Sequence, residues 1–208
     1  MSGTIMGRSA NVTWYEGRLS RQQRWHALGA CGATVWITGL PASGKSTLAA
    51  ALEERLVELG RWAYLLDGDN LRHGVSSDLG FSEQDRRTNI CRIGEIAALF
   101  ADAGAVAVAA LVSPFEAERC SVRERHERNG LNFVEVFIDT PLETCASRDP
   151  KGLYARARAG EIHNFTGVDD PYEPPIAPDL RVTEDMTVAA AVDAVLELLP
   201  TNQKGTSE

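Results

Sequence analysis

The eight residues from Gly39 to Ser46 have the types and spacing of a phosphate-binding loop, because they read Gly-Leu-Pro-Ala-Ser-Gly-Lys-Ser. Gly39 and Gly44 let the backbone turn so that successive N–H groups point at one anion. Lys45 supplies a compact positive charge for the β- and γ-phosphates, and the Ser46 hydroxyl suits Mg²⁺. We therefore expect nucleotide phosphates to contact Gly39, Leu40, Pro41, Ala42, Ser43, Gly44, Lys45, Ser46 and Thr47.

Such a loop needs a strand before it and a helix after it, and the sequence predicts both. The apolar, β-branched run Val35–Thr38 is typical of a buried strand. Apolar residues recur at helical spacing from Leu48 to Leu59, and Gly60 ends the helix. The N-terminus of this helix adds its dipole to the loop, which strengthens the prediction of phosphate binding.

Lysine usage points to one further residue. The chain contains 18 Arg and only three Lys, at positions 45, 151 and 204. A lysine retained against this preference suggests a place that needs a compact, flexible ammonium group. Lys45 belongs to the loop and Lys204 to a polar tail, so Lys151 requires a role.

Two acidic residues, Asp67 and Asp69, follow the predicted strand Trp62–Leu66 and come to the same edge of the sheet as the phosphate loop. They can orient Mg²⁺, directly or through water, or accept a proton from an attacking hydroxyl. The alternative is that these residues form only a turn, in which an Asp caps a helix. The strand Ala105–Leu111 ends in Val-Ser-Pro, without the usual metal-anchoring carboxylate of phosphate-loop NTPases, so the acidic pair must serve both the metal and the acceptor hydroxyl.

A stretch rich in arginine follows, and its last part is predicted to be helical. On helical spacing, Arg86 and Asn89 share one face and can grip an anion together. The alternative is an ordinary solvated, charged face. Composition does not decide between these two interpretations.

Composition favours one α/β domain, because the chain has 208 residues of which 44% are hydrophobic. The net charge of −8 argues against broad binding to nucleic acids or anionic membranes. No stretch approaches the ~20 apolar residues of a membrane span, and residues 1–12 lack the apolar core of a signal peptide, so we expect a cytoplasmic protein. The cysteines show no C-x-x-C spacing and are expected to be buried small hydrophobic residues, not disulfides or a zinc site; they are Cys31, Cys91, Cys120 and Cys145.

Strands and helices alternate along the chain, which predicts a parallel sheet covered on both faces. We expect residues 1–30 to form an N-terminal segment on the domain or on a partner subunit, residues 31–200 to form one domain, and 201–208 to be a flexible tail. Residues 140–178 are rich in Pro, Gly and charge, which favours an active-site lid at about 146–178. The further elements that we expect are a helix at Arg86–Ala103 ended by Gly104, a strand at Ala105–Val112, a helix at Glu116–Glu127 closed by Asn129-Gly130, strands at Phe133–Ile138 and Leu180–Val182, and a helix at Val188–Leu199.

Six motifs taken together closely resemble those of the adenylylsulfate kinase family, which uses ATP to phosphorylate the 3′-hydroxyl of adenosine 5′-phosphosulfate (APS). In the order of the family, they read Gly-Leu-Pro-Ala-Ser-Gly-Lys-Ser-Thr, Leu-Asp-Gly-Asp-Asn-Leu-Arg, Asp-Arg-Arg-Thr-Asn-Ile, Val-Ser-Pro-Phe, Arg-Asp-Pro-Lys-Gly-Leu-Tyr and Phe-Thr-Gly-Val-Asp-Asp-Pro-Tyr-Glu-Pro-Pro. The resemblance runs from about Val12 to Val182. It implies a P-loop NTPase fold of the nucleotide-kinase type, with three layers, a parallel sheet of roughly five strands and a mobile lid. It also implies Mg²⁺, ATP as co-substrate, a homodimer and functional coupling to an ATP sulfurylase.

The resemblance also implies roles for single residues. Asp69 matches the candidate base for the 3′-hydroxyl, with Asp67 beside it, and Lys45 acts on the γ-phosphate. Phe81 and Phe165 match the two rings that sandwich the adenine of APS, and flat rings on both faces of a base suit stacking. The other matching substrate positions are Arg72, Arg86 and Asn89 around the phosphosulfate, and Lys151, Gly152 and Leu153 in the lid.

Ser113 matches a position where some family members are described with a phosphoserine intermediate. Direct in-line transfer needs no such intermediate, so a backbone contact from Ser113 to APS is the interpretation we favour. The chain departs from the family at Glu116, where many relatives carry Arg, and at His163-Asn164, which replaces a frequent Lys-Gly. The first change weakens a charge contact or alters a helix surface, and the second tunes lid movement.

Two other functions compete with this interpretation. One is a gluconate- or nucleoside-type kinase of the same fold, against which the pair Phe81 and Phe165 argues because it suits a planar adenine acceptor. The other is an inactive nucleotide-binding or regulatory module attached to an ATP sulfurylase. Intact Lys45, Ser46 and Asp69 argue against this second alternative.

Overall fold

The computed structural model describes residue 13, residue 15 and residues 17–201. Residues 202–208 of the tail expected at 201–208 and much of the N-terminal segment expected at 1–30 therefore lie outside the described residues. Strands and helices alternate along the described part of the chain, as the sequence predicts.

A parallel sheet of five strands forms the middle layer, in the order β2-β3-β1-β4-β5. Every residue of the central strand β1 is buried, which accounts for its apolar and β-branched composition. Ile37 of β1 pairs with Ala110 of β3 on one side and with Val136 of β4 on the other. The predicted parallel α/β fold is confirmed. The strands are β1 Ala33–Gly39, β2 Ala63–Asp67, β3 Val106–Ala110, β4 Asn132–Ile138 and β5 Leu180–Val182.

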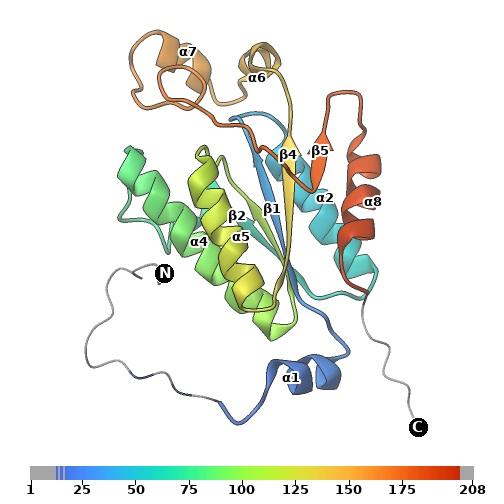
Figure 1. Ribbon diagram of the computed structural model, residues 1–208. Helices are drawn as coiled ribbons and strands as arrows, with labels where there is room; N and C mark the ends of the chain where they lie inside the picture. Colours follow the sequence, from blue (N-terminus) through green and yellow to red (C-terminus); the bar gives the residue numbers. More distant parts are fainter. Residues whose placement is uncertain (1–12, 14, 16, 202–208) are drawn as a thin grey trace.

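Helices cover both faces of this sheet (Figure 1). Leu52 of α2 and Val195 of α8 belong to the core on one face. Ile93 of α4 and Val122 of α5 pack with Trp36 of β1 on the other face. The layered architecture thus buries apolar side chains on both faces of the sheet. The covering helices are α2 Lys45–Glu58, α4 Glu83–Ala103, α5 Glu116–Arg128 and α8 Val188–Leu198.

A short helix that the sequence reasoning missed, α1, precedes the sheet and spans Arg21–Leu28. Ser20 caps its N-terminus. Asp102 at the end of α4 accepts Arg21 Nε at 2.7 Å and Arg24 Nη1 at 2.6 Å. These ion pairs hold α1 against its own domain.

We call the chain between β4 and β5 the lid, after the lid predicted at about 146–178; it lies beyond the carboxyl ends of the strands (Figure 1). It contains α6 (Leu142–Arg148) and α7 (Leu153–Arg158). A small apolar cluster inside the lid is formed by the buried residues Cys145, Tyr154, Ala157 and Phe165. This cluster is separate from the two cores on the faces of the sheet, and Leu40 and Ala42 of the phosphate loop pack against it.

Element boundaries differ from expectation at two places near the site. β3 ends at Ala110 rather than at Val112. α4 begins at Glu83 rather than Arg86, because the Ser82 hydroxyl accepts a hydrogen bond from the Asp85 N–H at 3.2 Å and caps the helix there. Both differences lengthen or shorten an element without moving it.

The expectation that all four cysteines are buried is wrong. Cys145 is buried, but Cys31 is only partly covered, and Cys91 and Cys120 are exposed. All four thiols are free. Cys91 lies on α4 and Cys120 on α5, where helix periodicity turns them outward.

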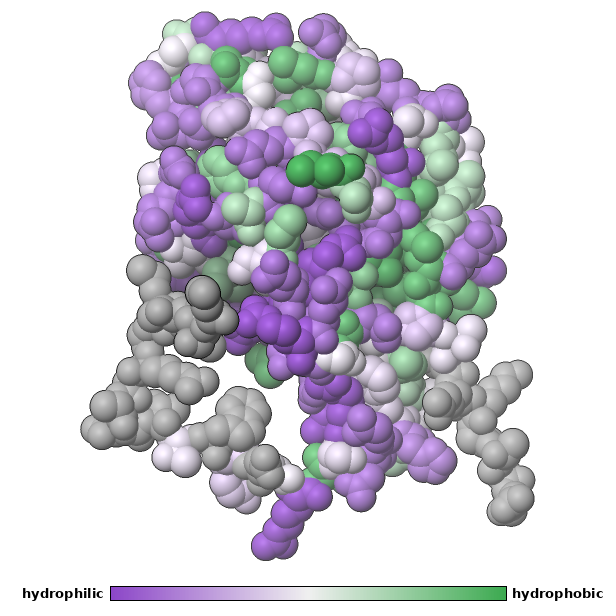
Figure 2. All heavy atoms as spheres, in the orientation of Figure 1, coloured by the Kyte–Doolittle hydropathy of each residue, from purple (hydrophilic) through white to green (hydrophobic). Residues whose placement is uncertain are grey.

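The surface is largely hydrophilic on the side that Figure 2 shows. Among the described residues, no helix has both the length and the apolar character to cross a membrane.

Candidate active site

The phosphate loop lies between β1 and α2, where the sequence predicts it. Gly39 has φ +154°, and a Cβ there would lie 2.8 Å from the Ile138 carbonyl oxygen. Gly44 has φ +110° and stands at the N-cap of α2. Both positions require glycine, the first mainly for space and the second for its left-handed backbone.

Lys45 is the charged residue of this loop and is only 9% exposed. Its ammonium group donates to the Leu40 carbonyl oxygen at 2.7 Å. Burial lowers the pKa of Lys45 to about 8, although the nearby carboxylates of Asp69 and Asp67 partly oppose this shift. A phosphate placed in the loop would restore the full charge, because an anion favours the protonated form.

The acidic pair lies at the end of β2, beside the loop. One carboxylate oxygen of Asp67 accepts a hydrogen bond from the Ser46 hydroxyl at 2.8 Å. The other accepts the Asp69 N–H at 2.9 Å and the Asn70 N–H at 3.3 Å, which caps the short helix α3 (Gly68–Leu71). Helix capping and a place beside the phosphate loop, the two interpretations of the sequence, are thus both realised by Asp67.

Lys151 of the lid lies directly over the second carboxylate. Its Nζ is 2.5 Å from Asp69 Oδ2, and this hydrogen bond raises the pKa of Lys151. The two side chains are 64% and 71% exposed, so the pair stands open to solvent. An exposed pair of this kind is weak and easily exchanged for other partners.

The predicted site residues line one cavity of about 530 Å³ between the sheet, α4 and the lid. A volume of this size suits a small-molecule ligand. From the predicted set, the lining includes Pro41, Ala42, Gly44, Lys45, Ser46, Thr47, Asp67, Asp69, Arg72, Phe81, Arg86, Asn89, Ser113, Lys151, Leu153 and Phe165. Gly39, Leu40, Ser43 and Gly152 belong to the same two loops but do not line the cavity.

Phe81 presents an open ring at one end of the cavity, because its side chain is 57% exposed. The Arg72 guanidinium lies 4.3 Å from the ring centroid, and that of Arg86 lies 5.7 Å away. Arg72 also donates to the Gly80 carbonyl oxygen at 2.8 Å, and Arg86 donates to that of Phe81 at 3.1 Å. Two cations and one aromatic ring are thus held together, and Asp170 Oδ2 lies 3.8 Å from Arg86 Nε.

Arg86 and Asn89, which share a helical face in the sequence, both line the cavity. The Asn89 side chain is buried, and its Oδ1 atom has no hydrogen-bond partner among the described residues. Burial without a partner is costly for a polar group. An unpartnered amide oxygen calls for a hydrogen-bond donor, so this favours contact with a ligand over a solvated face, although it gives no support to an anion as that ligand.

Phe165 reaches the cavity from the lid. Only 8% of it is exposed, and its ring meets that of Tyr154 edge-on, with centroids 4.9 Å apart at 81°. Tyr154 in turn donates its hydroxyl to the Pro41 carbonyl oxygen at 3.0 Å. The lid is thereby bonded to the phosphate loop, a contact that the sequence reasoning missed.

Ser113 stands on the loop after β3 with a left-handed backbone, at φ +38°. Its side chain is buried, accepts a hydrogen bond from Trp36 Nε1 at 3.2 Å and donates to Thr38 Oγ1 at 2.9 Å. The hydroxyl is therefore turned into the domain and occupied on both sides, whereas the residue itself lines the cavity.

The unusual dipeptide His163-Asn164 has a simple structural basis. Asn164 has φ +59°, in the left-handed region. Asparagine is among the non-glycine residues that best tolerate this conformation, so it can replace the frequent Gly of the family. The Asn164 N–H donates to Asp169 at 2.6 Å, and its carbonyl oxygen accepts a hydrogen bond from Arg86. The lid is thereby bonded to α4.

Several residues of the cavity were not singled out from the sequence as site residues. Most of them stand within the six motifs but were given no role of their own, whereas Ala110 and Leu111 lie outside the motifs, in the predicted strand Ala105–Val112. The further lining residues include Gly68, Ile90, Ala110, Leu111, Val112, Pro114, Arg148, Asp149, Pro150, Tyr154 and Thr166.

Comparison with known proteins identifies the family. The sequence profile described as adenylylsulphate kinase matches residues 31–183. The adenylyl-sulfate kinase of Citrobacter koseri is 53% identical over 189 residues, which cover 91% of this chain and 93% of the relative. That of Clostridium acetobutylicum is 51% identical and covers 92% of this chain and 95% of the relative.

A solved structure agrees with these sequence matches. The APS kinase of Mycobacterium tuberculosis, in complex with AMPPNP and APS, has a TM-score of 0.80 and 50% identity, and the match covers 83% of this chain and 99% of that chain. The profile match, the identity with relatives and the shared fold lead to one conclusion: the chain belongs to the adenylylsulphate kinase family.

Proposed function

We propose that this chain transfers the γ-phosphate of ATP to the 3′-hydroxyl of APS, which gives 3′-phospho-APS (PAPS) and ADP in sulfate activation. The observation that carries the proposal is the single cavity that holds Lys45 and Ser46 at one end and Phe81 and Phe165 farther along, with Asp69 beside them. A phosphate donor and a planar acceptor then lie in one enclosure. Family membership supports the same reaction.

On the donor side, the loop amides and the Lys45 ammonium hold the β- and γ-phosphates. The ligand-free contact of Lys45 with the Leu40 carbonyl is exchanged for phosphate oxygens. The charge acts on the phosphoryl group during transfer, so positioning and charge neutralisation supply most of the rate.

On the acceptor side, Phe81 and Phe165 stack on the adenine of APS, and Arg72, Arg86 and Asn89 bind its phosphosulfate. Asp69 orients the 3′-hydroxyl and accepts its proton. Lys151, with Gly152 and Leu153 behind it, leaves Asp69 and turns to the bound ligand as the lid closes. The ion pair at 2.5 Å supports this exchange because it already places Lys151 over the reacting group.

We further propose Mg²⁺ as the cofactor. The residues fit it, since the Ser46 hydroxyl and the Asp67 carboxylate are hard oxygen ligands that lie 2.8 Å apart beside the phosphate loop. Among the described residues no group of three or more His, Cys, Asp or Glu side chains could hold a metal ion. This suits Mg²⁺, which is held largely by substrate phosphates and water and neutralises their charge when bound. Asp69 completes the surroundings through water.

Ser113 acts through its backbone in this proposal, not as a phosphoserine. Its hydroxyl is buried and bonded to Trp36 and Thr38, so it would have to be freed before it could accept a phosphate. Mass spectrometry of the enzyme after incubation with ATP alone should find no added phosphate at Ser113.

Three features beyond the site complete the proposal. The chain forms a homodimer, which is supported by the exposed aromatic side chains of Trp62 and Tyr64 near the edge strand β2 and by Leu99 of α4. It works in the cytoplasm, where its four free thiols remain reduced. It receives APS from a separate ATP sulfurylase.

Release of ADP from ATP, measured with and without APS, tests the function. Fast release only with APS supports the proposal. Release with gluconate or an ordinary nucleoside, and none with APS, would favour the other kinase class. Binding of ATP without turnover on any acceptor would favour the inactive regulatory module.

A further inference from the structure

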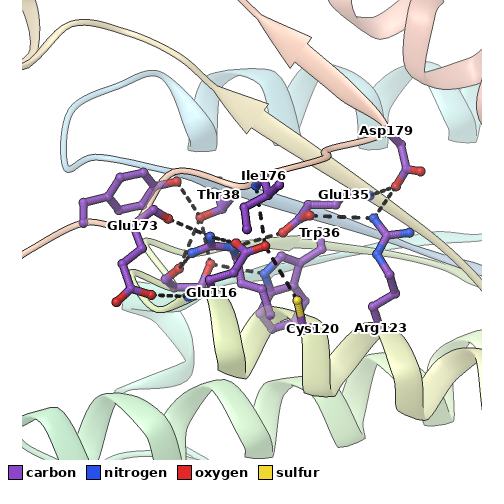
Figure 3. A network of polar contacts seen from close by, with 12 residues as sticks. Trp36, Thr38, Glu116, Cys120, Arg123, Glu135, Glu173, Ile176 and Asp179 are labelled. Atoms are coloured by element: carbon purple, nitrogen blue, oxygen red, sulfur yellow. Dashed lines mark hydrogen bonds and ion pairs between the residues drawn. The ribbon is translucent and has the colours of Figure 1, made fainter.

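The segment that follows the lid is held to the domain around one buried arginine. We call residues 172–179 the strap; it runs from the lid to β5, and Figure 3 shows the polar network beside it. Arg119 of α5 lies within this network, and its side chain is only 1% exposed. The mechanism described above does not use this residue.

Arg119 joins three parts of the molecule at once. Its Nη1 atom donates to the Ser113 carbonyl oxygen at 2.6 Å, and its Nη2 atom donates to the Glu173 carbonyl oxygen of the strap at 2.6 Å. Nε lies 3.1 Å from Glu135 Oε1 of β4, close enough for an ion pair but without the alignment of a hydrogen bond. Nη2 also pairs with the Glu116 carboxylate.

Each backbone carbonyl group of the loop that Arg119 reaches accepts a hydrogen bond. We call residues 112–114 the acceptor loop, because it forms one wall of the cavity. The Val112 carbonyl oxygen accepts the Thr38 hydroxyl at 2.7 Å, and the Pro114 carbonyl oxygen accepts the Glu173 N–H at 2.8 Å. With Ser113 bonded to Arg119, three consecutive carbonyl groups each have a donor, and two of these donors depend on Arg119 or on the strap.

These hydrogen bonds stabilise an unfavourable backbone conformation, because Ser113 is left-handed at φ +38°. A residue other than glycine keeps such a conformation only where its surroundings enforce it. Tyr172 of the strap adds to the enforcement, since its hydroxyl lies 3.0 Å from Thr38 Oγ1.

We propose that Arg119 is a positioning residue that fixes the acceptor loop in its left-handed shape and anchors the end of the lid at Glu173. The distance between the Ser113 carbonyl group and Glu173 then stays constant while the rest of the lid moves. In its kinetic part, this inference rests on the proposed function, because the acceptor loop is the wall against which APS binds.

The network explains why an arginine is needed and why Glu116 is tolerated. A planar guanidinium can donate to two carbonyl oxygens in different directions, whereas a lysine ammonium on a single stem cannot span both at these distances. Glu116 supplies a carboxylate to Arg119, and its other oxygen lies 3.5 Å from the Ile176 N–H of the strap. The Glu116 N–H in turn donates to the Glu173 carboxylate at 2.7 Å. The departure at 116 is thus part of the strap contact.

The test compares Arg119→Lys with Arg123→Lys. Arg123 is a matched control because it lies one helical turn later, is 3.7 Å from Glu135, contacts the strap only at its last residue, Asp179, at 2.6 Å, and touches neither the acceptor loop nor the cavity. For Arg119→Lys we expect KM for APS to rise about tenfold, the size of one lost hydrogen bond to a charged group, with KM for ATP within about twofold of wild type. Arg123→Lys should leave both constants within about twofold.

Hydrogen exchange of the strap supplies a readout that needs no substrate. The Glu173 amide should exchange faster in Arg119→Lys, while amides of β1 stay protected. This measurement also distinguishes failure of the proposed function from failure of the role proposed for Arg119. If the wild type does not phosphorylate APS, the proposed function is wrong, and the exchange comparison still tests whether Arg119 holds the strap to the acceptor loop. Unchanged KM for APS together with unchanged protection of Glu173 would overturn the inference.

A second variant decides the matter if Arg119→Lys does not fold. Tyr172→Phe keeps the ring, which lies 6.0 Å from that of Phe137, and removes only the bond to Thr38. A rise of about two- to fivefold in KM for APS with faster exchange at Glu173 supports the proposed link between the strap and the acceptor loop. Wild-type values of both in Tyr172→Phe would reject it.

Discussion

Asp69 is the residue whose assigned role is easiest to separate from binding. Asp69→Asn keeps the shape and removes the charge, so we expect kcat to fall about 10²- to 10⁴-fold while KM for APS changes little. Asp78→Asn is the control, because Asp78 is a neighbouring exposed carboxylate that pairs with Arg92 at 2.5 Å outside the cavity. A loss confined to KM for APS would make Asp69 a binding residue instead.

Lys45 leads to a prediction about pH. Its pKa of about 8 lies below the value of 10.5 that it has when unfolded. The unfolded chain therefore binds more protons between pH 8 and 10.5, and this group makes the ligand-free fold more stable as pH rises through that window.

Binding of ATP should reverse the effect, because phosphates favour the protonated ammonium. At pH 8.5 to 9 we expect ATP binding to take up a proton fraction that approaches one, and the affinity to fall as pH rises further. Calorimetry in buffers of different ionisation heats measures this uptake. Lys45→Met should show almost none, and an equally small uptake in the wild type would contradict the assigned environment of Lys45.

At the scale of elements, we expect the lid to close over APS opposite the loop that bears Phe81. The lid already contacts the phosphate loop through Tyr154 and contacts α4 through Asn164. We expect APS with ADP to protect the exposed trypsin sites Lys151, Arg156 and Arg158, because closure covers them. ADP with gluconate should give no protection. Cleavage at the same rate with APS and ADP as without ligand would show that the lid does not close over APS.

The two rings contribute to the same closure. Phe81→Ala and Phe165→Ala should each remove ~1–3 kcal/mol of APS binding and spare ATP, because stacking acts on the acceptor base. Phe100→Ala is a matched control, since Phe100 stacks on Tyr64 at the far edge of the sheet. Normal APS affinity in both ring variants would remove the sandwich and leave the kinase reaction untouched.

The sequence predicts long elements and the phosphate loop well, because their signals are local. The run into Gly39 and the periodicity up to Gly60 fix β1 and α2 without any distant contact. The helices α1, α6 and α7 were missed because they are short and depend on tertiary contacts. The Asp149 side chain, for example, accepts the Leu153 N–H at 2.7 Å at the start of α7.

The motifs of the candidate site could be predicted from the sequence, but the long-range contacts that connect them could not. Nothing in the sequence distinguishes Arg119 from the other arginines of a charged helix. Its partner Glu173 is 54 positions away, and Tyr172 and Thr38 are separated by 134 positions. Contacts of such separation follow from the topology of the sheet, not from a local pattern.

At the scale of the whole molecule, the two ends of the cavity rest on different parts of the fold. β1 is the central strand and ends directly in the phosphate loop, so the donor end rests on the most buried part of the protein. The acceptor end is built from α4, the acceptor loop and the lid with its small apolar cluster. We therefore expect closure of the lid to act mainly on the proposed acceptor end.

The central claim is that APS is the acceptor and that its 3′-hydroxyl meets the γ-phosphate beside Asp69. The most direct measurement is ³¹P nuclear magnetic resonance of the product formed from ATP, Mg²⁺ and APS, together with the amount of ADP released. We predict one new phosphate on the 3′-oxygen of APS for each ADP formed, and none with a Lys45→Ala variant that is folded. A phosphate on another oxygen, or ADP formed without phosphorylated APS, would contradict the account.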